Sequence, residues 1–128
     1  MKKTYIRILN PIYPFKIHVF LGYSVAEEIN KEVKCKSKSD TKIIHERIKD
    51  LDFTNVHGYC VESLGHIFII VKTYEHTSNF YDVLHHEITH AVFKSAFYIG
   101  IDHTIESEEF YSYMHGFITN QIYKKILN

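Results

Sequence analysis

The sequence has little cysteine, no surplus of charge of either sign and no long hydrophobic run. Its 128 residues include two cysteines, and 15 Lys and Arg side chains are balanced by 15 Asp and Glu side chains. Cys35 and Cys60 form no CxxC pair and are too few for a disulfide framework, which favours a reducing compartment. Balanced charge argues against a protein that mainly coats nucleic acid or an acidic membrane, so we do not expect a nucleic-acid partner.

No stretch approaches the length of a membrane-spanning helix. The longest early apolar run is interrupted by Pro11, Pro14, Lys16 and His18, whereas a spanning helix needs about 20 predominantly apolar residues. The same interruptions argue against a signal peptide. We therefore expect a cytoplasmic protein with no membrane partner. The length fits one domain, residues 1–128, built around a single core.

Local patterns predict an α+β fold. Runs of β-branched and aromatic residues between turn residues predict strands, and apolar residues at helical spacing predict helices. The predicted strands are Tyr5–Leu9, Lys16–Leu21, Tyr59–Leu64 and Ile67–Val71, and the predicted helices are 25–34, Ile43–Leu51, Asn79–Tyr98 and Ile105–Leu127. This order predicts a small, mostly antiparallel sheet with helices packed on one side.

Several short signals predict how these elements begin and end. Ser24, with Glu27 three residues later, predicts a capping box at the first helix. Residues 36–42 contain no large apolar side chain and predict an exposed loop. Gly65 and His66 predict a two-residue hairpin turn. The nearly all-apolar strand that follows is expected to be covered on both faces, although residues 67–73 are also a candidate for pairing with an extended peptide.

Two of the ten histidines form a metal-binding pattern. His86, Glu87 and His90 match HExxH inside the predicted helix Asn79–Tyr98, which Thr77, Ser78 or Asn79 can cap and after which Gly100 follows. Residues four apart lie on one face of a helix, so both imidazoles can bind one Zn²⁺ while Glu87 reaches a water molecule. His85 stands five residues from His90 and points elsewhere. The alternative is that these are ordinary helical histidines that bind no metal.

Catalytic zinc takes three protein ligands and leaves one position for water, so a third ligand is required. The candidates after the motif are Asp102, His103, Glu106, Glu108 and Glu109. By helical phase, Glu108 aligns with a polar stripe that includes His115. Glu106 and Glu109 align instead with Phe110, Tyr113 and Phe117, the face expected to pack against the HExxH helix. This phase favours Glu109, followed by Glu106 and then His103.

The segments VLHHEITHAVF and GIDHTIESEEFYSYMHGFI, with the hairpin before them, resemble small HExxH zincin-like proteins encoded by tailed phages, of the gluzincin type of metallopeptidase. The resemblance extends over residues 56–122 and more loosely over residues 16–34. It implies a zincin-like (minimal gluzincin) fold, with His86, His90 and Glu109 as zinc ligands and Glu87 as the general base. The neighbouring Glu108 leaves that register open by one residue.

The expected function is zinc-dependent hydrolysis of peptide bonds. Glu87 is the expected base, and Tyr113, one turn beyond Glu109, is a candidate donor to the oxyanion, with His115 and His103 as alternatives. The partner is then a peptide or protein substrate. The alternative function is a binding or regulatory module that keeps the fold without proteolysis and, in a phage, captures a host protein. The remaining histidines are expected on the surface or in loops: His18, His45, His57, His66, His76, His85 and His115.

Overall fold

The computed structural model describes residues 2–127. In chain order the elements are β1 (Thr4–Leu9), β2 (Lys16–Leu21), α1 (Ala26–Glu32), α2 (Lys38–Lys49), β3 (Gly58–Ser63), β4 (His66–Val71), α3 (Ser78–Tyr98), the short 3-10 helix η1 (Ile105–Ser107) and α4 (Glu108–Ile126). The α+β class is confirmed. No helix in the described part of the chain is long and apolar enough to cross a membrane.

The four strands form one mixed sheet in the order β1-β2-β4-β3. The outer pairs β1/β2 and β3/β4 are antiparallel, whereas the central pair β2/β4 is parallel, with Ile17 opposite Ile67. Two of the three pairs are antiparallel, as the prediction of a mostly antiparallel sheet requires, but the parallel central pair was not predicted. Local patterns give strands and hairpins but not the pairing of strands that are distant in sequence, and here α1, α2 and β3 intervene between β2 and β4.

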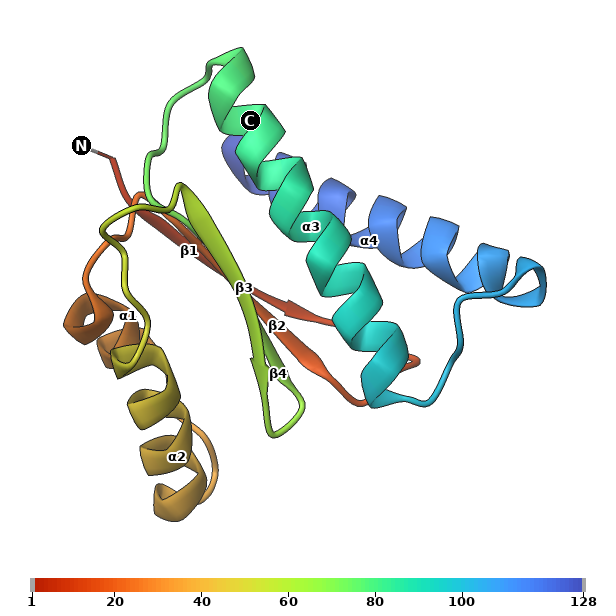
Figure 1. The fold of residues 1–128 in the computed structure, drawn as a ribbon, viewed down its shortest axis with the longest axis horizontal. Coiled ribbons are helices and arrows are strands. Elements are labelled where there is room, and N and C mark those ends of the chain that lie inside the picture. The colour runs from red at the N-terminus through yellow and green to blue at the C-terminus, as the bar shows by residue number, and fades with distance from the viewer. Residues whose placement is uncertain (1, 128) are drawn as a thin grey trace.

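Helices cover both faces of the sheet, so the prediction of helices on one side and of a single core is wrong. Figure 1 shows α1 and α2 on one side of the sheet and α3 and α4 on the other. Ile17, Ile67 and Ile69 belong to the core beneath α3 and α4. Phe20 and Phe68 belong to a second core beneath α1 and α2. Successive residues of a strand point to opposite faces, and the apolar strand β4 is covered on both, as expected.

The first two helices differ in how their N-termini are capped. Val25 is the N-cap of α1 and no side chain caps it, so the capping box predicted from Ser24 and Glu27 does not form. In contrast, the Ser37 hydroxyl accepts a hydrogen bond from the Asp40 amide at 3.0 Å. This cap starts α2 at Lys38, inside the segment predicted as a loop, because Ser at the N-cap satisfies a free amide of the first turn.

The β3–β4 hairpin turns at Leu64 and Gly65, one residue earlier than predicted. Both have positive φ, 53° and 79°, which is the requirement of a type I′ turn. His66 is therefore the first residue of β4. Because β4 lies between β2 and β3, its backbone is already paired, and the edge strands are β1 and β3. The suggestion that residues 67–73 pair with a peptide is accordingly wrong.

The long helix α3 lies diagonally over the sheet with α4 beside it (Figure 1). The Thr77 hydroxyl accepts a hydrogen bond from the Phe80 amide at 3.2 Å and caps α3. At the other end the chain reverses through Gly100, whose φ of 78° suits glycine. The predicted helix Ile105–Leu127 corresponds to η1 followed by α4.

Candidate metal centre

The three residues of the HExxH pattern come together on one turn of α3. The Nε2 atoms of His86 and His90 lie 3.2 Å apart. One ligand atom from each of His86, Glu87 and His90 lies within 4.8 Å of the others, and both histidines are exposed while Glu87 is buried. These residues form a group that can hold a metal ion.

The spacing of the two imidazoles fits a tetrahedral ion. Zn–N bonds of about 2.0–2.1 Å at a tetrahedral angle require nitrogen atoms about 3.3–3.4 Å apart. The observed 3.2 Å agrees with that requirement to within about 0.2 Å. Two imidazole nitrogens and a neighbouring carboxylate also match the ligand chemistry of zinc and other first-row transition ions.

Glu87 is a buried carboxyl group, with a relative exposure of 6%. Burial raises its pKa above the ordinary value, and the positive charges of His86, His90 and Lys94 oppose this rise. A carboxylate in such a position is suited to accept a proton near neutral pH. Glu87 is therefore a buried carboxyl group with a raised pKa beside two exposed imidazoles.

A glycine on the neighbouring strand leaves the space that Glu87 occupies. A Cβ atom at Gly58, the first residue of β3, would lie 3.2 Å from both Cγ and Oε2 of Glu87 and 2.7 Å from the Ile70 carbonyl oxygen. Gly58 was not among the site residues predicted from the sequence. The only signal was a glycine at the start of a predicted strand, which by itself is an ordinary strand boundary.

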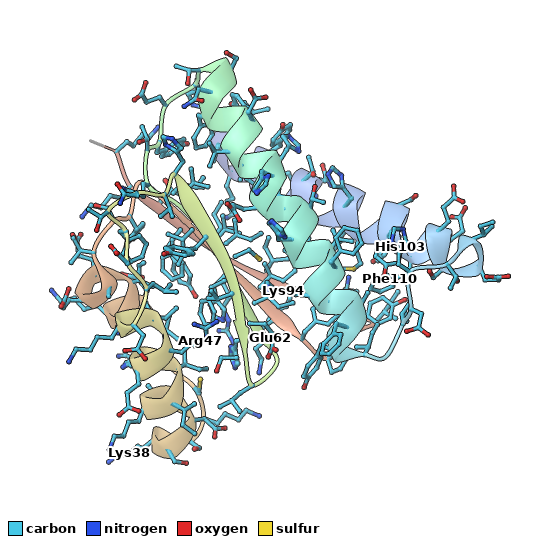
Figure 2. All side chains as sticks on the ribbon, viewed as in Figure 1. Lys38, Arg47, Glu62, Lys94, His103 and Phe110 are labelled. Carbon is cyan, nitrogen blue, oxygen red and sulfur yellow. The ribbon has the colours of Figure 1, made fainter. Side chains whose placement is uncertain are left out.

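A cavity opens on each side of the metal-binding group. One, of about 400 Å³, is lined by His86, Glu87 and Gly58, with Val83 beside them. The other, of about 540 Å³, contains His90 and extends toward the C-terminal end of α3. Figure 2 labels four residues of its lining: Arg47 on α2, Glu62 on β3, Lys94 on α3, and His103 in the segment after α3.

Side chains on one face of α4 contact α3. The ring of Tyr111 lies 5.3 Å from that of Phe93, and His115 stacks on His85 with a centroid distance of 5.7 Å. Glu108 precedes Tyr111 by three residues and so lies on this same side of the helix. The polar stripe that includes Glu108 and His115 therefore lies on the side of α4 that meets the HExxH helix.

Glu109 and Tyr113 lie on a different side of α4 from the one that contacts α3. The Tyr113 hydroxyl accepts a hydrogen bond from Asn10 Nδ2 at 3.2 Å, and its ring stacks on Phe117. Asn10 belongs to the connection between β1 and β2, so the helical phase inferred for α4 is wrong. Glu109 is exposed one turn before Tyr113. Its role as a zinc ligand and the role of Tyr113 as a donor remain predictions.

His103 and Asp102 are the candidate ligands that share a cavity with His90. The His103 ring packs 5.2 Å from Phe93 and 4.7 Å from Tyr111. Glu106 is exposed in η1. Within residues 2–127, no residue of the segment 102–109 joins His86, Glu87 and His90 in the group of close ligand atoms.

Several histidines expected on the surface or in loops have specific partners. A hydrogen bond of 2.6 Å joins His85 Nε2 to the Tyr123 hydroxyl. His18 is buried, with a relative exposure of 3%, and is hydrogen-bonded to both Tyr5 and His66. The expectation of a surface position is wrong for His18, because its partners Tyr5 and His66 are far away in sequence and have no diagnostic spacing.

Comparisons of this chain with protein families, with curated proteins and with solved structures found no match.

Proposed function

We propose that this protein is a zinc-dependent peptide hydrolase of the gluzincin type with a zincin-like fold. The observation that carries the proposal is the pair of imidazole nitrogens 3.2 Å apart with the buried carboxyl group of Glu87 on the same helical turn. The resemblance to phage-encoded HExxH proteins supports the same reading, and a cytoplasmic location fits the low cysteine content.

In this proposal His86 and His90 hold the ion, and the carboxyl group of Glu87 moves protons. Zinc bound there would supply a Lewis acid that polarises a carbonyl group and lowers the pKa of water. Glu87 accepts a proton from the attacking water and delivers it to the departing amine. Burial against Gly58 holds the carboxylate in place for both transfers.

The substrate in this proposal is an extended peptide that pairs with β3. This strand is an edge of the sheet, and an edge strand offers unpaired backbone groups to a further strand. Gly58, at its first position, lies in the cavity that contains His86 and Glu87. A peptide added along β3 therefore passes the metal-binding group.

A second candidate is a binding module that keeps the metal but does not cleave peptides. The observation that favours it is the apolar surface beside His90, where Phe93 is 42% exposed and Phe97 is 87% exposed. Exposed aromatic side chains beside a cavity are typical of protein-binding surfaces. The partner would then be a protein, for instance a host protein if the chain is phage-encoded.

The test combines metal analysis with cleavage of a peptide library. We expect one zinc per chain in protein purified without an affinity tag. We expect Glu87→Gln to retain zinc and to lose cleavage by about 10²-fold or more, the range for general acid–base catalysis. Glu46→Gln, at an exposed position of α2, is the matched control and should cleave like the original protein.

Each outcome separates the alternatives. Unchanged cleavage by Glu87→Gln would overturn the proposed mechanism. Zinc binding without cleavage of any peptide would favour the binding module. Purified protein that contains no zinc would indicate that His86 and His90 are ordinary helical residues that bind no metal.

A further inference from the structure

A second cluster of titratable side chains lies away from the metal-binding group. The Tyr5 hydroxyl is hydrogen-bonded to His18 Nδ1 at 2.7 Å, and His18 Nε2 is hydrogen-bonded to His66 Nδ1 at 2.9 Å. At the end of this chain His66 Nε2 lies 3.7 Å from Cys35 Sγ. Three side chains thus connect in series to one thiol.

This cluster lies on the face of the sheet covered by α1 and α2. Tyr5, Cys35 and Phe68 belong to the core on that face, and His18 stacks on Phe68 with a centroid distance of 4.8 Å. Glu87 is on α3, which packs on the opposite face. The cluster is therefore separate from the metal-binding group and needs an explanation of its own.

The arrangement has the parts of an activated nucleophile. A reactive cysteine requires a base within reach and a third group that orients the base. His66 is the base within reach of Cys35, and His18, fixed by Tyr5 and by stacking, orients His66. Cys35 and His66 are both partly exposed, so a small reagent can reach the thiol.

We propose that Cys35 is a nucleophilic thiol that exchanges with small anionic disulfides such as glutathione disulfide. The Cys35 proton passes to His66 Nε2, and the thiolate attacks one sulfur of the disulfide. The original S–S bond breaks as the new bond to Cys35 forms, and the departing thiolate takes the proton from His66. Cys35 is oxidised to a mixed disulfide, one half of the reagent is reduced, and no further oxidant is required.

Positive charge near the thiol favours an anionic reagent. The Cys35 amide donates a hydrogen bond to the Thr41 hydroxyl at 2.9 Å, and Thr41 lines a cavity of about 410 Å³ with Lys38, Lys42 and Lys49. Glutathione disulfide carries carboxylates that these ammonium groups attract. Lys34 and Lys36 also flank Cys35 in the sequence.

Five charged or titratable groups act on His66 from the neighbouring elements. His18 and Lys16 on β2, Arg7 on β1, Asp40 on α2 and Glu62 on β3 surround it. Burial lowers the pKa of His66, Lys16 and Arg7 lower it further, and Asp40 and Glu62 oppose them. His66 is thereby kept neutral near pH 7, the state in which it can accept the thiol proton.

The test is the rate of mixed-disulfide formation at pH 7 with glutathione disulfide, followed by mass spectrometry of the intact chain and its peptides. We expect Cys35 to react at least about tenfold faster than in His66→Gln, because an unassisted thiol is only a few per cent ionised at this pH. Cys60 is the internal comparison, since burial raises its pKa to about 12 and it should stay unmodified.

Three further measurements make the result decisive. Cys60→Ala should leave the Cys35 rate unchanged. The advantage of the original protein over His66→Gln should be greatest below the ordinary thiol pKa of about 8.5, where a thiol without a base is mostly protonated. Tyr5→Phe removes only the distal hydroxyl, and we expect it to shift this pH profile while His66 still accelerates the reaction. Equal rates and equal pH profiles in the original protein and a folded His66→Gln would overturn the proposal.

Discussion

The carboxyl group of Glu87 keeps its position because the strand beside it has no side chain at position 58. A methyl group at Gly58 would lie 3.2 Å from the carboxyl oxygen and closer still to the Ile70 carbonyl oxygen. The site therefore depends on a residue that has no functional group and that binds no metal. A search for titratable residues alone does not find it.

Stability should depend on pH through His18. Burial, chiefly, lowers its pKa from 6.5 to about 3. Between these two values the unfolded chain binds a proton that the folded chain does not, so the contribution of neutral His18 is complete above pH 6.5 and is lost as pH falls toward 3. We expect urea unfolding to show up to about 2 kcal/mol less stability at pH 5 than at pH 7 from this group. His18→Phe should reduce this difference, and an equal loss in both proteins would contradict the assignment.

The HExxH residues could be predicted because their geometry is local. Within one helix, spacing in sequence fixes spacing in space, and His86 and His90 meet as expected. The orientation of Glu109 and Tyr113 depends instead on how α4 rotates about its axis when it packs. That rotation follows from contacts such as Tyr111 with Phe93, which no pattern within α4 specifies.

The bounds of helices and strands could be predicted best where the sequence pattern allowed only one start and one end. The strand Lys16–Leu21 and the helix ending at Tyr98 have the predicted bounds or nearly so. The start of α2 was predicted too late because its cap, Ser37, lies in a polar segment that has no large apolar side chain. Ile44 and Ile48 are fully buried, and their packing stabilises α2 over Lys38–Lys49.

The start of α3 should depend on one hydroxyl group. From the sequence, Thr77, Ser78 and Asn79 were all possible N-caps of α3. In the structure the Thr77 hydroxyl accepts the hydrogen bond from the Phe80 amide. We expect Thr77→Ala to lower the free energy of unfolding by about 1 kcal/mol, the usual cost of losing an N-cap. Ser78→Ala, inside the first turn, is the matched control and should change it by less than about 0.5 kcal/mol. Chemical denaturation of both variants checks this, and the opposite ranking would assign the cap to Ser78.

One sheet separates the HExxH residues from the cluster that contains Cys35 and His66. His86 and His90 lie on the helix that packs against one face, and Cys35 and His66 lie toward the other. A four-stranded sheet with a core on each face keeps the two groups of side chains apart. The chain therefore has room for two independent sites in 128 residues.

Zinc should link α3 to residues 102–109 by taking ligands from both. Suppose that the third ligand comes from residues 102–109. Zinc at about 100 times its Kd then raises the free energy of unfolding by about 2.7 kcal/mol. For a chain of this size, that increase raises Tm by on the order of 10 °C. We expect one of His103→Ala, Glu106→Ala, Glu108→Ala and Glu109→Ala to abolish most of this shift. The resemblance favours Glu109, whereas Glu108 lies on the side of α4 that meets α3.

Thermal unfolding with and without a chelator measures the shift, with Glu46→Ala on α2 as the control. If these four variants and Asp102→Ala all keep the full shift, the third ligand does not come from this segment.

The parallel pairing of β2 with β4 also determines the order in which the chain can assemble. Ile17 pairs with Ile67, so this contact closes a loop of about fifty residues, and such long closures slow folding because entropy is lost before contacts form. The β1–β2 pair can form early, but the surface that receives α3 is complete only when β4 has joined it. The helical turn with His86 and His90 therefore reaches its final surroundings late, and an ion held there would stabilise the finished fold without guiding its first steps.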